Sequence, residues 1–416
     1  HAAAGVSARH AEIMWDLGRL RDGLEAMDRS FKVLAEEPPD ANLAWLAAQI
    51  GRFKYFAGEE EVAADRLETA LQIAESLGLP EVLSQALDTK GLLLSTRGRR
   101  KEGIALLRYS LDVALEHDKP SAALRAYNNL ADTAHQDDQY AGAQRYVDDG
   151  ISLARRVGNR YWELILLGQI YPPYALGDWD GALARRGELG VLGEHSQART
   201  AYTQGFVTFG VAIHVNRGDL AAAAELLEAY SALEASADVQ EQGEFAAART
   251  LMLAAQGDVP GALEAARATL AQRGHLGLDD ARIKEVLVVG VDAALTAGDR
   301  SAAEELLQIA SERTQGHVTH FALAHSMRFQ ARMADGSQDP ARTEDAWKGA
   351  IGLFREMALP FWTAVTLLEQ AEWLTAQDRA QDASPIRDEA RTIFESLGAR
   401  PWLERANAMS VAAKTT

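Results

Sequence analysis

Three histidines that lie close together are the residues whose spacing comes nearest to a metal site. They are His317, His320 and His325, in the stretch HVTHFALAH. Successive residues of an α-helix are turned by about 100°, so these imidazoles would spread over about 140° of the helix surface. Imidazole ligands of zinc must converge on one point. The spacing therefore favours ordinary polar positions at a helix start, and we predict no metal site.

Clusters of neighbouring carboxylates are the second candidate for chemistry. They occur at Glu59–Glu61, Asp137–Asp138, Asp148–Asp149 and Asp279–Asp280. A general acid needs a carboxyl group whose pKa its surroundings have raised, whereas several of these clusters fall at turns or helix starts, where acids stay hydrated. The motifs H-E-x-x-H, G-x-S-x-G and G-x-G-x-x-G are absent, and there is no cysteine. We therefore predict a protein that is not an enzyme and carries no cofactor.

The net charge indicates which kinds of partner the chain can bind. The 416 residues include 60 acidic and 42 basic side chains, for a formal net charge of −18. A nucleic acid would be repelled by such a field, so we predict no nucleic-acid partner. The apolar runs fall short of the ~18 residues that cross a bilayer, which predicts no membrane partner, and we expect a cytoplasmic location. The first residues, HAAAGVSARH, have neither an initiator Met nor a signal-peptide pattern, and this start is typical of a fragment.

A turn signal recurs along the chain at a nearly constant interval. It is usually a Gly followed by a polar residue, with a small residue about five positions later. The spacings are 40, 40, 40, 39, 41, 39, 41, 38 and 41. The turns begin at Gly18, Gly58, Gly98, Asp138, Gly177, Gly218, Gly257, Gly298, Gly336 and Gln377.

Helical periodicity fills the segments between these turns. In RLETALQIAESL, one stripe holds Leu67, Ala70, Leu71, Ala74 and Leu77. Words such as SLGLP then close each unit, with Gly just past a helix and Pro soon after. Each unit therefore reads as helix A, tight turn, helix B and loop. One such pair cannot bury its apolar stripe alone, but a stack of pairs can.

We therefore predict an all-α fold, a right-handed superhelical solenoid of about ten antiparallel helix pairs. No linker interrupts the period, so residues 1–399 are expected to form one continuous array with a truncated first unit. Residues 400–416 are expected to add a short closing helix and a tail.

The word RAYNNLADTAHQDDQYAGAQRYVDDGISLA resembles a tetratricopeptide repeat in its longer form of roughly 40 residues. The stretches 350–374 (AIGLFREMALPFWTAVTLLEQAEWL) and 390–406 (ARTIFESLGARPWLERA) resemble the last repeats of MalT-like, STAND-type signalling ATPases of bacteria. In those proteins the repeats follow an ATPase module, and the effector is a LuxR-type DNA-binding domain or a cyclase. This chain has no G-x-x-x-x-G-K-[ST] motif, so the resemblance covers the sensor region only.

The resemblance implies a non-catalytic sensor that binds a protein or peptide, with a small effector and its own upstream ATPase module as further candidate partners. The alternative is a free-standing scaffold that grips an extended peptide.

In tetratricopeptide arrays helix A lines a concave groove, and ligands commonly meet residues four to thirteen positions before the turn. Asn129 matches the helix-A asparagine that holds a ligand backbone or carboxylate in peptide-clamping members, and two arginines would supply a charge clamp. In units 6 to 8 the same positions are mostly apolar, as at Phe209, Ala248 and Val289. The groove residues implied by the resemblance are Gln49, Arg52, Asp88, Thr89, Arg125, Asn128, Asn129, Asp132, Tyr171 and Tyr174.

The stretch YPPY at 171–174 interrupts helix A of the fifth unit. Proline removes amide donors and clashes with the preceding turn, so Pro172 and Pro173 should end or kink this helix early. Two interpretations stay open. The helix ends one turn short with its aromatic residues packed between units, or a kink turns Tyr171 and Tyr174 and opens a pocket.

Overall fold

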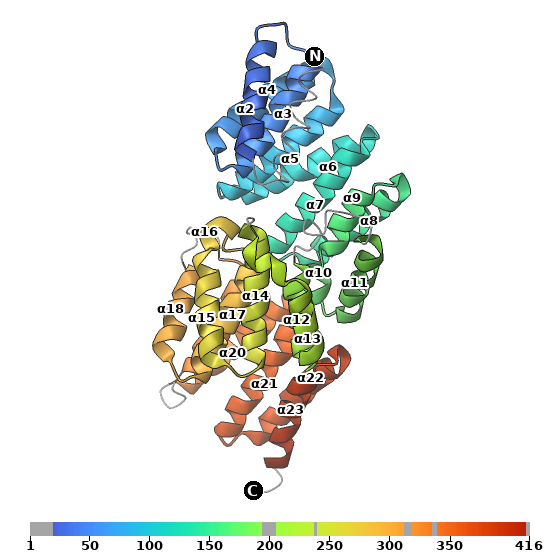
Figure 1. The fold of residues 1–416 in the computed structure, drawn as a ribbon. Helices are drawn as coiled ribbons and strands as arrows, with labels where there is room; N and C mark the ends of the chain where they lie inside the picture. Colours follow the sequence, from blue (N-terminus) through green and yellow to red (C-terminus); the bar gives the residue numbers. More distant parts are fainter. Residues whose placement is uncertain (1–19, 194–204, 237–238, 312–317, 335–338, 413–416) are drawn as a thin grey trace. The chain divides into compact units, whose positions relative to one another are not determined.

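The computed structural model describes residues 20–193, 205–236, 239–311, 318–334 and 339–412. These residues form α-helices joined by short turns, with one short 3-10 helix and no strand among them (Figure 1). The all-α prediction is confirmed. Helices A and B of each repeat follow one another along the chain as antiparallel neighbours, with few connecting residues.

The chain divides into two compact units. Unit 1 comprises residues 1–133 and 145–166, and unit 2 comprises residues 134–144 and 167–416. The helices that lie wholly in unit 1 are α2 (Leu20–Leu34), α3 (Ala41–Phe56), α4 (Glu60–Leu77), α5 (Pro80–Thr96) and α6 (Arg100–Glu116). Three helices have residues in both units: α7 (Pro120–Gln136), α8 (Tyr140–Val157) and α9 (Arg160–Gly168).

Unit 2 contains the remaining helices. They are α10 (Tyr171–Ala175), α11 (Trp179–Gly193), α12 (Phe206–Asn216), α13 (Leu220–Ala229), η1 (Ser231–Ala235), α14 (Val239–Ala255), α15 (Val259–Ala271), α16 (Arg273–Leu276), α17 (Ala281–Thr296), α18 (Arg300–Ser311), α19 (His320–Met333), α20 (Pro340–Glu356), α21 (Pro360–Ala376), α22 (Ala380–Leu397) and α23 (Arg400–Ala412). The closing helix expected after residue 400 is α23.

The periodic turn residues adopt the left-handed conformation that reverses the chain. Gly58 has φ 77°, which costs glycine little because it has no Cβ. Asp138 holds the same position with φ 59°, and its side chain forms hydrogen bonds that stabilise it there. In the last turn the left-handed residue is Asp378, with φ 58°, one position past the predicted Gln377. The predicted turn residues Gly18 and Gly336 lie outside the described residues.

Glycines inside helices allow the two helices of a repeat to approach closely. A Cβ atom on Gly91 of α5 would lie 2.8 Å from the carbonyl oxygen of Gly103 and 2.8 Å from Cγ of Leu107, both on α6. Gly103 and its counterpart Ala63 are the small residues five positions after their turns. Their predicted role in helix contact is confirmed by the burial of both residues.

The fifth repeat departs from the pattern because its helix A is broken in two. Helix α9 ends at Gly168 and α10 begins at Tyr171. The break lies before the prolines, which occupy the first turn of α10, where an amide hydrogen would have no acceptor in the helix. The prediction that the prolines would end or kink this helix early is met by an interruption at residues 169–170, after which a short helix continues to Ala175. Proline terminates helices through the residues that precede it.

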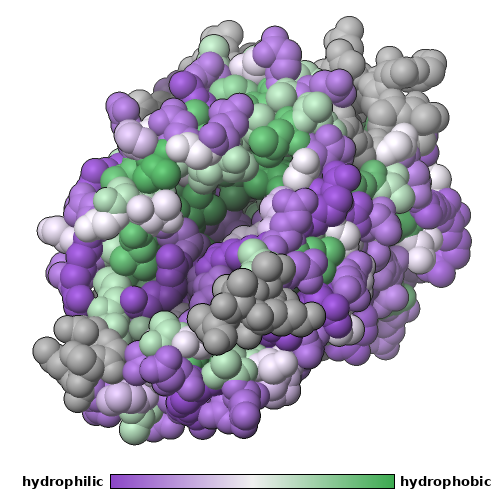
Figure 2. Space-filling view, turned by 90° about the horizontal axis from the view of Figure 1, so that it is seen from below, coloured by the Kyte–Doolittle hydropathy of each residue, from purple (hydrophilic) through white to green (hydrophobic). Residues whose placement is uncertain are grey.

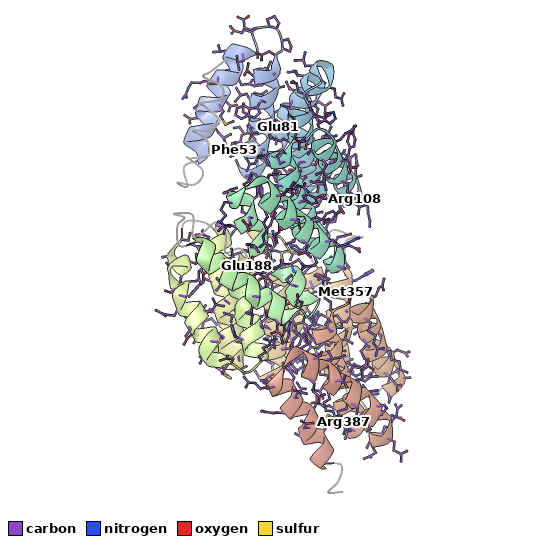
Figure 3. All side chains as sticks on the ribbon, turned by 90° about the vertical axis from the view of Figure 1, so that its right-hand side faces the viewer. Phe53, Glu81, Arg108, Glu188, Met357 and Arg387 are labelled. Carbon is purple, nitrogen blue, oxygen red and sulfur yellow. The ribbon has the colours of Figure 1, made fainter. Side chains whose placement is uncertain are left out.

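The helix-A faces of unit 2 pack on one another. Helix α21 is buried along most of its length, and the ring of Phe361 lies 5.5 Å from that of Trp179 of α11. At α23, Nε1 of Trp402 donates a hydrogen bond to Oδ1 of Asn216 of α12 (3.2 Å). Phe209 and Ala248, predicted for an apolar groove, are buried in this core. On the face that Figure 2 shows, hydrophilic side chains cover much of the area and apolar side chains lie between them. Arg108, on helix α6, is exposed and projects outward (Figure 3).

Candidate functional site

The helix-A residues of unit 1 form a continuous polar cluster that we call the polar face. Its members lie on α3, α5 and α7, one helix from each of three successive repeats. They are Gln49, Arg52, Gln85, Asp88, Arg125, Asn128, Asn129 and Asp132. Seven of these eight residues were predicted from the sequence; Gln85 was not, although it lies 13 positions before the turn at Gly98 and thus within the range of the count.

Asp88 lies at the centre of the polar face. It is 1% exposed on α5, and its Oδ2 accepts a hydrogen bond of 2.7 Å from Nδ2 of Asn129 on α7. On the other side, Nε2 of Gln49 on α3 donates to Oε1 of Gln85 on α5, 2.8 Å away. Helix α5 is thus bonded through side chains to the helix A before it and the helix A after it. These bonds fix the orientation of the four side chains that form them.

The remaining members are half-buried and form the accessible part of the polar face. Nδ2 of Asn128 donates to Oδ2 of Asp132 (3.3 Å), one helical turn further along α7. The Arg52 guanidinium lies 5.2 Å from the centre of the Phe53 ring and 5.9 Å from that of Phe56. Amides that donate and accept, carboxylates and guanidinium groups therefore line one face.

Burial dominates the electrostatics of this site. Desolvation raises the pKa of Asp88 from 3.8 to about 6, against the opposing effects of the Arg125 charge, the Asn129 hydrogen bond and the Arg52 charge. The buried carboxyl group of Asp88 therefore changes between its neutral and charged forms near pH 6. It can accept two further hydrogen bonds when charged.

Three buried polar atoms of the polar face have no hydrogen-bond partner among the described residues. They are Oε1 of Gln49, Oδ1 of Asp88 and Nε of Arg125. A buried polar group left unpaired costs about 1–3 kcal/mol, so native proteins keep few of them. Two acceptors and one donor thus remain unpaired in the polar face, each with almost no surface open to water.

Tyr171 and Tyr174 do not belong to this site. Both lie on α10 in unit 2, and each is 3% exposed. Their rings pack against Phe209 of α12, with centroid distances of 4.4 Å and 5.2 Å. Nε1 of Trp179 donates to the carbonyl oxygen of Tyr174 (3.1 Å). Of the two interpretations of YPPY, the structure matches the one in which the aromatic residues pack between repeats.

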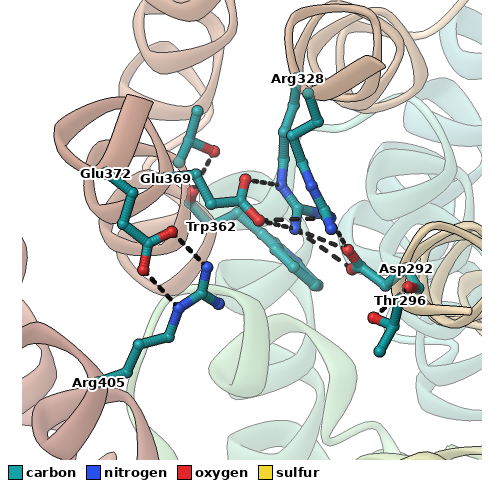
Figure 4. Close-up of polar contacts among 9 residues, drawn as sticks. Asp292, Thr296, Arg328, Trp362, Glu369, Glu372 and Arg405 are labelled. Atoms are coloured by element: carbon teal, nitrogen blue, oxygen red, sulfur yellow. Dashed lines mark hydrogen bonds and ion pairs between the residues drawn. The ribbon is translucent and has the colours of Figure 1, made fainter. Parts of the chain in front are cut away.

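A second polar cluster, in unit 2, was missed from the sequence. The guanidinium of Arg328 on α19 is buried and binds Glu369 of α21 through Nε (2.6 Å) and Nη2 (2.7 Å) (Figure 4). Nη2 also donates to Oδ1 of Asp292 on α17 (3.1 Å). Arg328 lies eight positions before Gly336, so the spacing that predicts groove residues in the other repeats applies to it as well. We assign this cluster to the cohesion of unit 2, because it joins three helix-A segments.

The histidines of the stretch 317–325 do not share one environment. His320 is exposed at the start of α19 and His325 is buried, while His317 lies outside the described residues. Within the described ranges no three His, Asp or Glu side chains are grouped so that they could hold a metal ion. None of the helices described is long and apolar enough to cross a membrane.

The repeating antiparallel helix pairs define the fold as that of an α-helical repeat protein, similar in its repeats to the tetratricopeptide type. No protein-family model matches the sequence, and no curated protein matches it significantly. Among solved structures, a monomeric mutant of IFIT1 with m7Gppp-AAAA is similar at 13% identity and a TM-score of 0.49, over 98% of this chain and 90% of that one. The apo form of the quorum sensor NprR from B. thuringiensis has 11% identity and a TM-score of 0.40, over 94% and 98%. At such scores the class rests on the repeating geometry of this chain itself.

Proposed function

We propose that this chain is a non-catalytic interaction module that binds an extended peptide segment of a partner protein on the polar face of unit 1. The observation that carries the proposal is the set of unpartnered buried atoms of Gln49, Asp88 and Arg125. A peptide unit brings one N–H donor and one C=O acceptor, which can pair with one of the two acceptors and with the donor. A peptide that also carries a carboxylate has the half-buried arginines as partners.

Asn129 has the main positioning role in this proposal. Its Nδ2 is engaged by Asp88, while its Oδ1 receives only a long bond of 3.4 Å from Asn128. The carbonyl of the Asn129 side chain therefore faces a ligand N–H with its orientation already fixed. Orientation before binding reduces the entropy that a ligand must lose together with the site.

The wider context belongs to the same proposal. The resemblance of residues 350–374 and 390–406 to the last repeats of STAND-type signalling ATPases supports a sensor region of such a bacterial regulator, located in the cytoplasm. In this arrangement the peptide or effector binds the repeats, and the change in packing between repeats is passed to the ATPase module. The net charge of −18 supports a protein or peptide ligand over a nucleic acid.

Selection of peptides on the whole purified chain tests the binding proposal. Peptides recovered from a random displayed library are then titrated by calorimetry against the wild-type chain, Asn129→Ala, Arg125→Gln and the control Asp112→Asn. Asp112 is an exposed carboxylate on α6, a helix-B position away from the polar face. We expect at least a tenfold loss of affinity in Asn129→Ala and Arg125→Gln and no change in the control. Equal affinity for all four chains would refute a peptide site on the polar face.

The reading frame that encodes this chain tests the regulator context separately. A phosphate-binding G-x-x-x-x-G-K-[ST] segment upstream in the same frame is the outcome that the regulator context requires. A frame in which the repeats stand alone would favour the scaffold that grips a peptide without an ATPase.

A further inference from the structure

Unit 2 makes contacts that an ordinary array of repeats lacks. In such an array each repeat contacts only its neighbours. In unit 2, three of the periodic turns also lie against the start of a helix that is 183 positions further along the chain. We call this line of contacts the seam, and its pairs are Asp138 with Phe321, Gly177 with Pro360, and Gly218 with Pro401.

The seam is strongest at its first pair. Oδ2 of Asp138 accepts a hydrogen bond of 2.7 Å from the backbone N–H of Phe321. Oδ1 of the same carboxylate accepts from Nζ of Lys284 (2.7 Å) and from the hydroxyl group of Tyr140 (3.0 Å). All four residues are buried. A buried ion pair with its further hydrogen bonds satisfied is costly to break, because separation would leave a charge without a partner.

The last pair of the seam lies near the surface and has weaker bonds. The exposed side chain of Arg400, at the start of α23, donates from Nε to the carbonyl oxygen of Arg217 (2.9 Å). Nε of Arg217 donates in turn to the carbonyl oxygen of Leu397 (3.1 Å). Water can replace each of these bonds at little cost. Separation of the seam should therefore begin at α23.

Helix α23 has two sets of contacts, and one of them is unusual for a helix that caps an array. As a cap, it packs on the preceding α22, and Arg405 forms an ion pair with Glu372 of α21 (2.6 Å) (Figure 4). Its first turn also contacts α12. There Nε1 of Trp402 donates to Oδ1 of Asn216 (3.2 Å), 186 positions earlier in the chain. An ordinary cap has only the first set of contacts.

The first turn of α23 covers an aromatic cluster. The ring of Trp402 stacks on that of Phe394 with 5.8 Å between centroids, and it meets Phe361 edge-on at 5.6 Å. Phe361 continues the cluster to Trp179 of α11, 5.5 Å away. Phe361 and Phe394 are buried. Movement of the first turn of α23 away from α12 would expose apolar rings, and large exposed apolar patches commonly bind other proteins.

We propose that α23 is a latch, which holds the superhelical turn of unit 2 closed at the weak end of the seam and keeps the aromatic cluster covered. The latch opens by a local separation of α23 from α12, while the buried bonds at Asp138 keep the rest of the seam closed. This proposal is independent of the polar face, because each of its residues lies in unit 2.

A pair of glycine variants tests the seam from the side of the turn. Gly218 and Gly257 have nearly the same left-handed backbone, with φ 74° and 76°, so alanine is equally strained at either position. Only at Gly218 would the new methyl group meet another part of the chain, 3.0 Å from Cγ of Pro401. By hydrogen–deuterium exchange of the whole chain, we expect Gly218→Ala to speed exchange in residues 400–412 at least tenfold. Gly257→Ala should leave these residues unchanged, and equal rates in the two variants would overturn the proposal.

A second pair of variants tests the latch from the side of α23 and decides the matter if Gly218→Ala does not fold. Arg400→Gln removes an exposed side chain that bonds to Arg217, whereas Arg405→Gln removes one that bonds within the cap. We expect exchange in residues 206–216 to become faster in Arg400→Gln and to stay unchanged in Arg405→Gln. The same result in both variants would mean that α23 is an ordinary cap.

The wild-type chain in low concentrations of urea shows whether the latch opens as one step. Residues 206–216 and 400–412 should exchange with the same dependence on urea, and at urea concentrations below those that unfold unit 2. The proposal is overturned if α23 exchanges without residues 206–216, because that is fraying of a single helix. It is equally overturned if both segments exchange only when unit 2 unfolds.

Discussion

The side-chain amide of Asn129 donates a 2.7 Å hydrogen bond to the buried carboxylate of Asp88, 41 positions earlier in the chain. This bond joins the helix A of one repeat to the helix A of the next. It leaves Oδ1 of Asp88 without a partner among the described residues. The same pair therefore joins two helices of unit 1 and leaves one buried acceptor unpaired.

The stability of unit 1 should depend on pH through Asp88. Its carboxyl binds a proton more tightly in the folded chain, where the pKa is about 6, than in the unfolded chain, where it is 3.8. The contribution of Asp88 to the free energy of unfolding is thus fully present below pH 4 and is lost as the pH rises through 6. Between these two limits the free energy of unfolding falls by about 3 kcal/mol at most. Asp88→Asn should therefore raise the urea midpoint at pH 8 relative to the wild type and have little effect at pH 4.

The exposed carboxylate Asp112 provides the control for this comparison. Asp112→Asn should change the urea midpoint by the same small amount at both pH values. A midpoint of Asp88→Asn that is shifted equally at pH 4 and pH 8 would mean that burial does not govern the ionisation of Asp88.

The buried ion pairs of unit 2 should be strongly coupled. Removal of one partner in Glu369→Gln leaves the Arg328 guanidinium buried with less compensation, and we expect a loss of about 3–5 kcal/mol in the free energy of unfolding. The double variant Arg328→Met with Glu369→Leu should lose much less than the sum of its single changes. The exposed pair Arg300–Glu304 is the control, and Glu304→Gln should cost about 0.5 kcal/mol or less. Additive losses in the double variant would contradict the coupling.

Tyr174→Ala should lower the stability of unit 2 and leave peptide binding on unit 1 unchanged. The ring is buried against Trp179 and Phe209, so its removal should cost about 3–5 kcal/mol in the stability of unit 2. A peptide selected on the wild-type chain should still bind with unchanged affinity at temperatures where the variant is folded. A large loss of affinity without unfolding, measured by calorimetry, would place Tyr174 in the ligand site after all.

Close contact of helices at Gly91 should make this position intolerant of a side chain. Gly91→Ala would place a methyl group 2.8 Å from the backbone oxygen of Gly103, and backbone atoms cannot move aside cheaply. We expect it to destabilise unit 1 by about 1–3 kcal/mol. Gly187 of α11 is the matched control, because nothing lies within 4 Å of an added Cβ there. Gly187→Ala should stabilise by about 0.5–1 kcal/mol, and thermal unfolding of both variants would show whether the signs differ.

The helices and most of the polar face could be predicted from short sequence patterns. The left-handed turn residues and the helical periodicity both follow from short stretches of sequence, so helix pairs could be placed from Gly58 onward. Counting back from each turn found Asp88 and Asn129, because helix geometry fixes which residues share a face.

Contacts between repeats that lie far apart in the sequence could not be predicted from turn residues and helical periodicity. Nothing in the stretch QIYPPYALGD shows that Tyr171 and Tyr174 will pack on Phe209, more than 30 positions later. The burial of the helix-A faces of unit 2 also depends on pairs such as Asn216 and Trp402, which are 186 positions apart. A count by position cannot distinguish a groove that is open from one that its own chain fills.

Hydrogen–deuterium exchange of the whole chain with and without a selected peptide tests the central claim most directly. If the polar face is the binding site, the peptide should slow exchange in residues 41–56, 80–96 and 120–133 and leave residues 281–311 and 320–333 unchanged. Protection confined to unit 2, or a bound peptide that protects none of these three helix-A segments, would contradict the account.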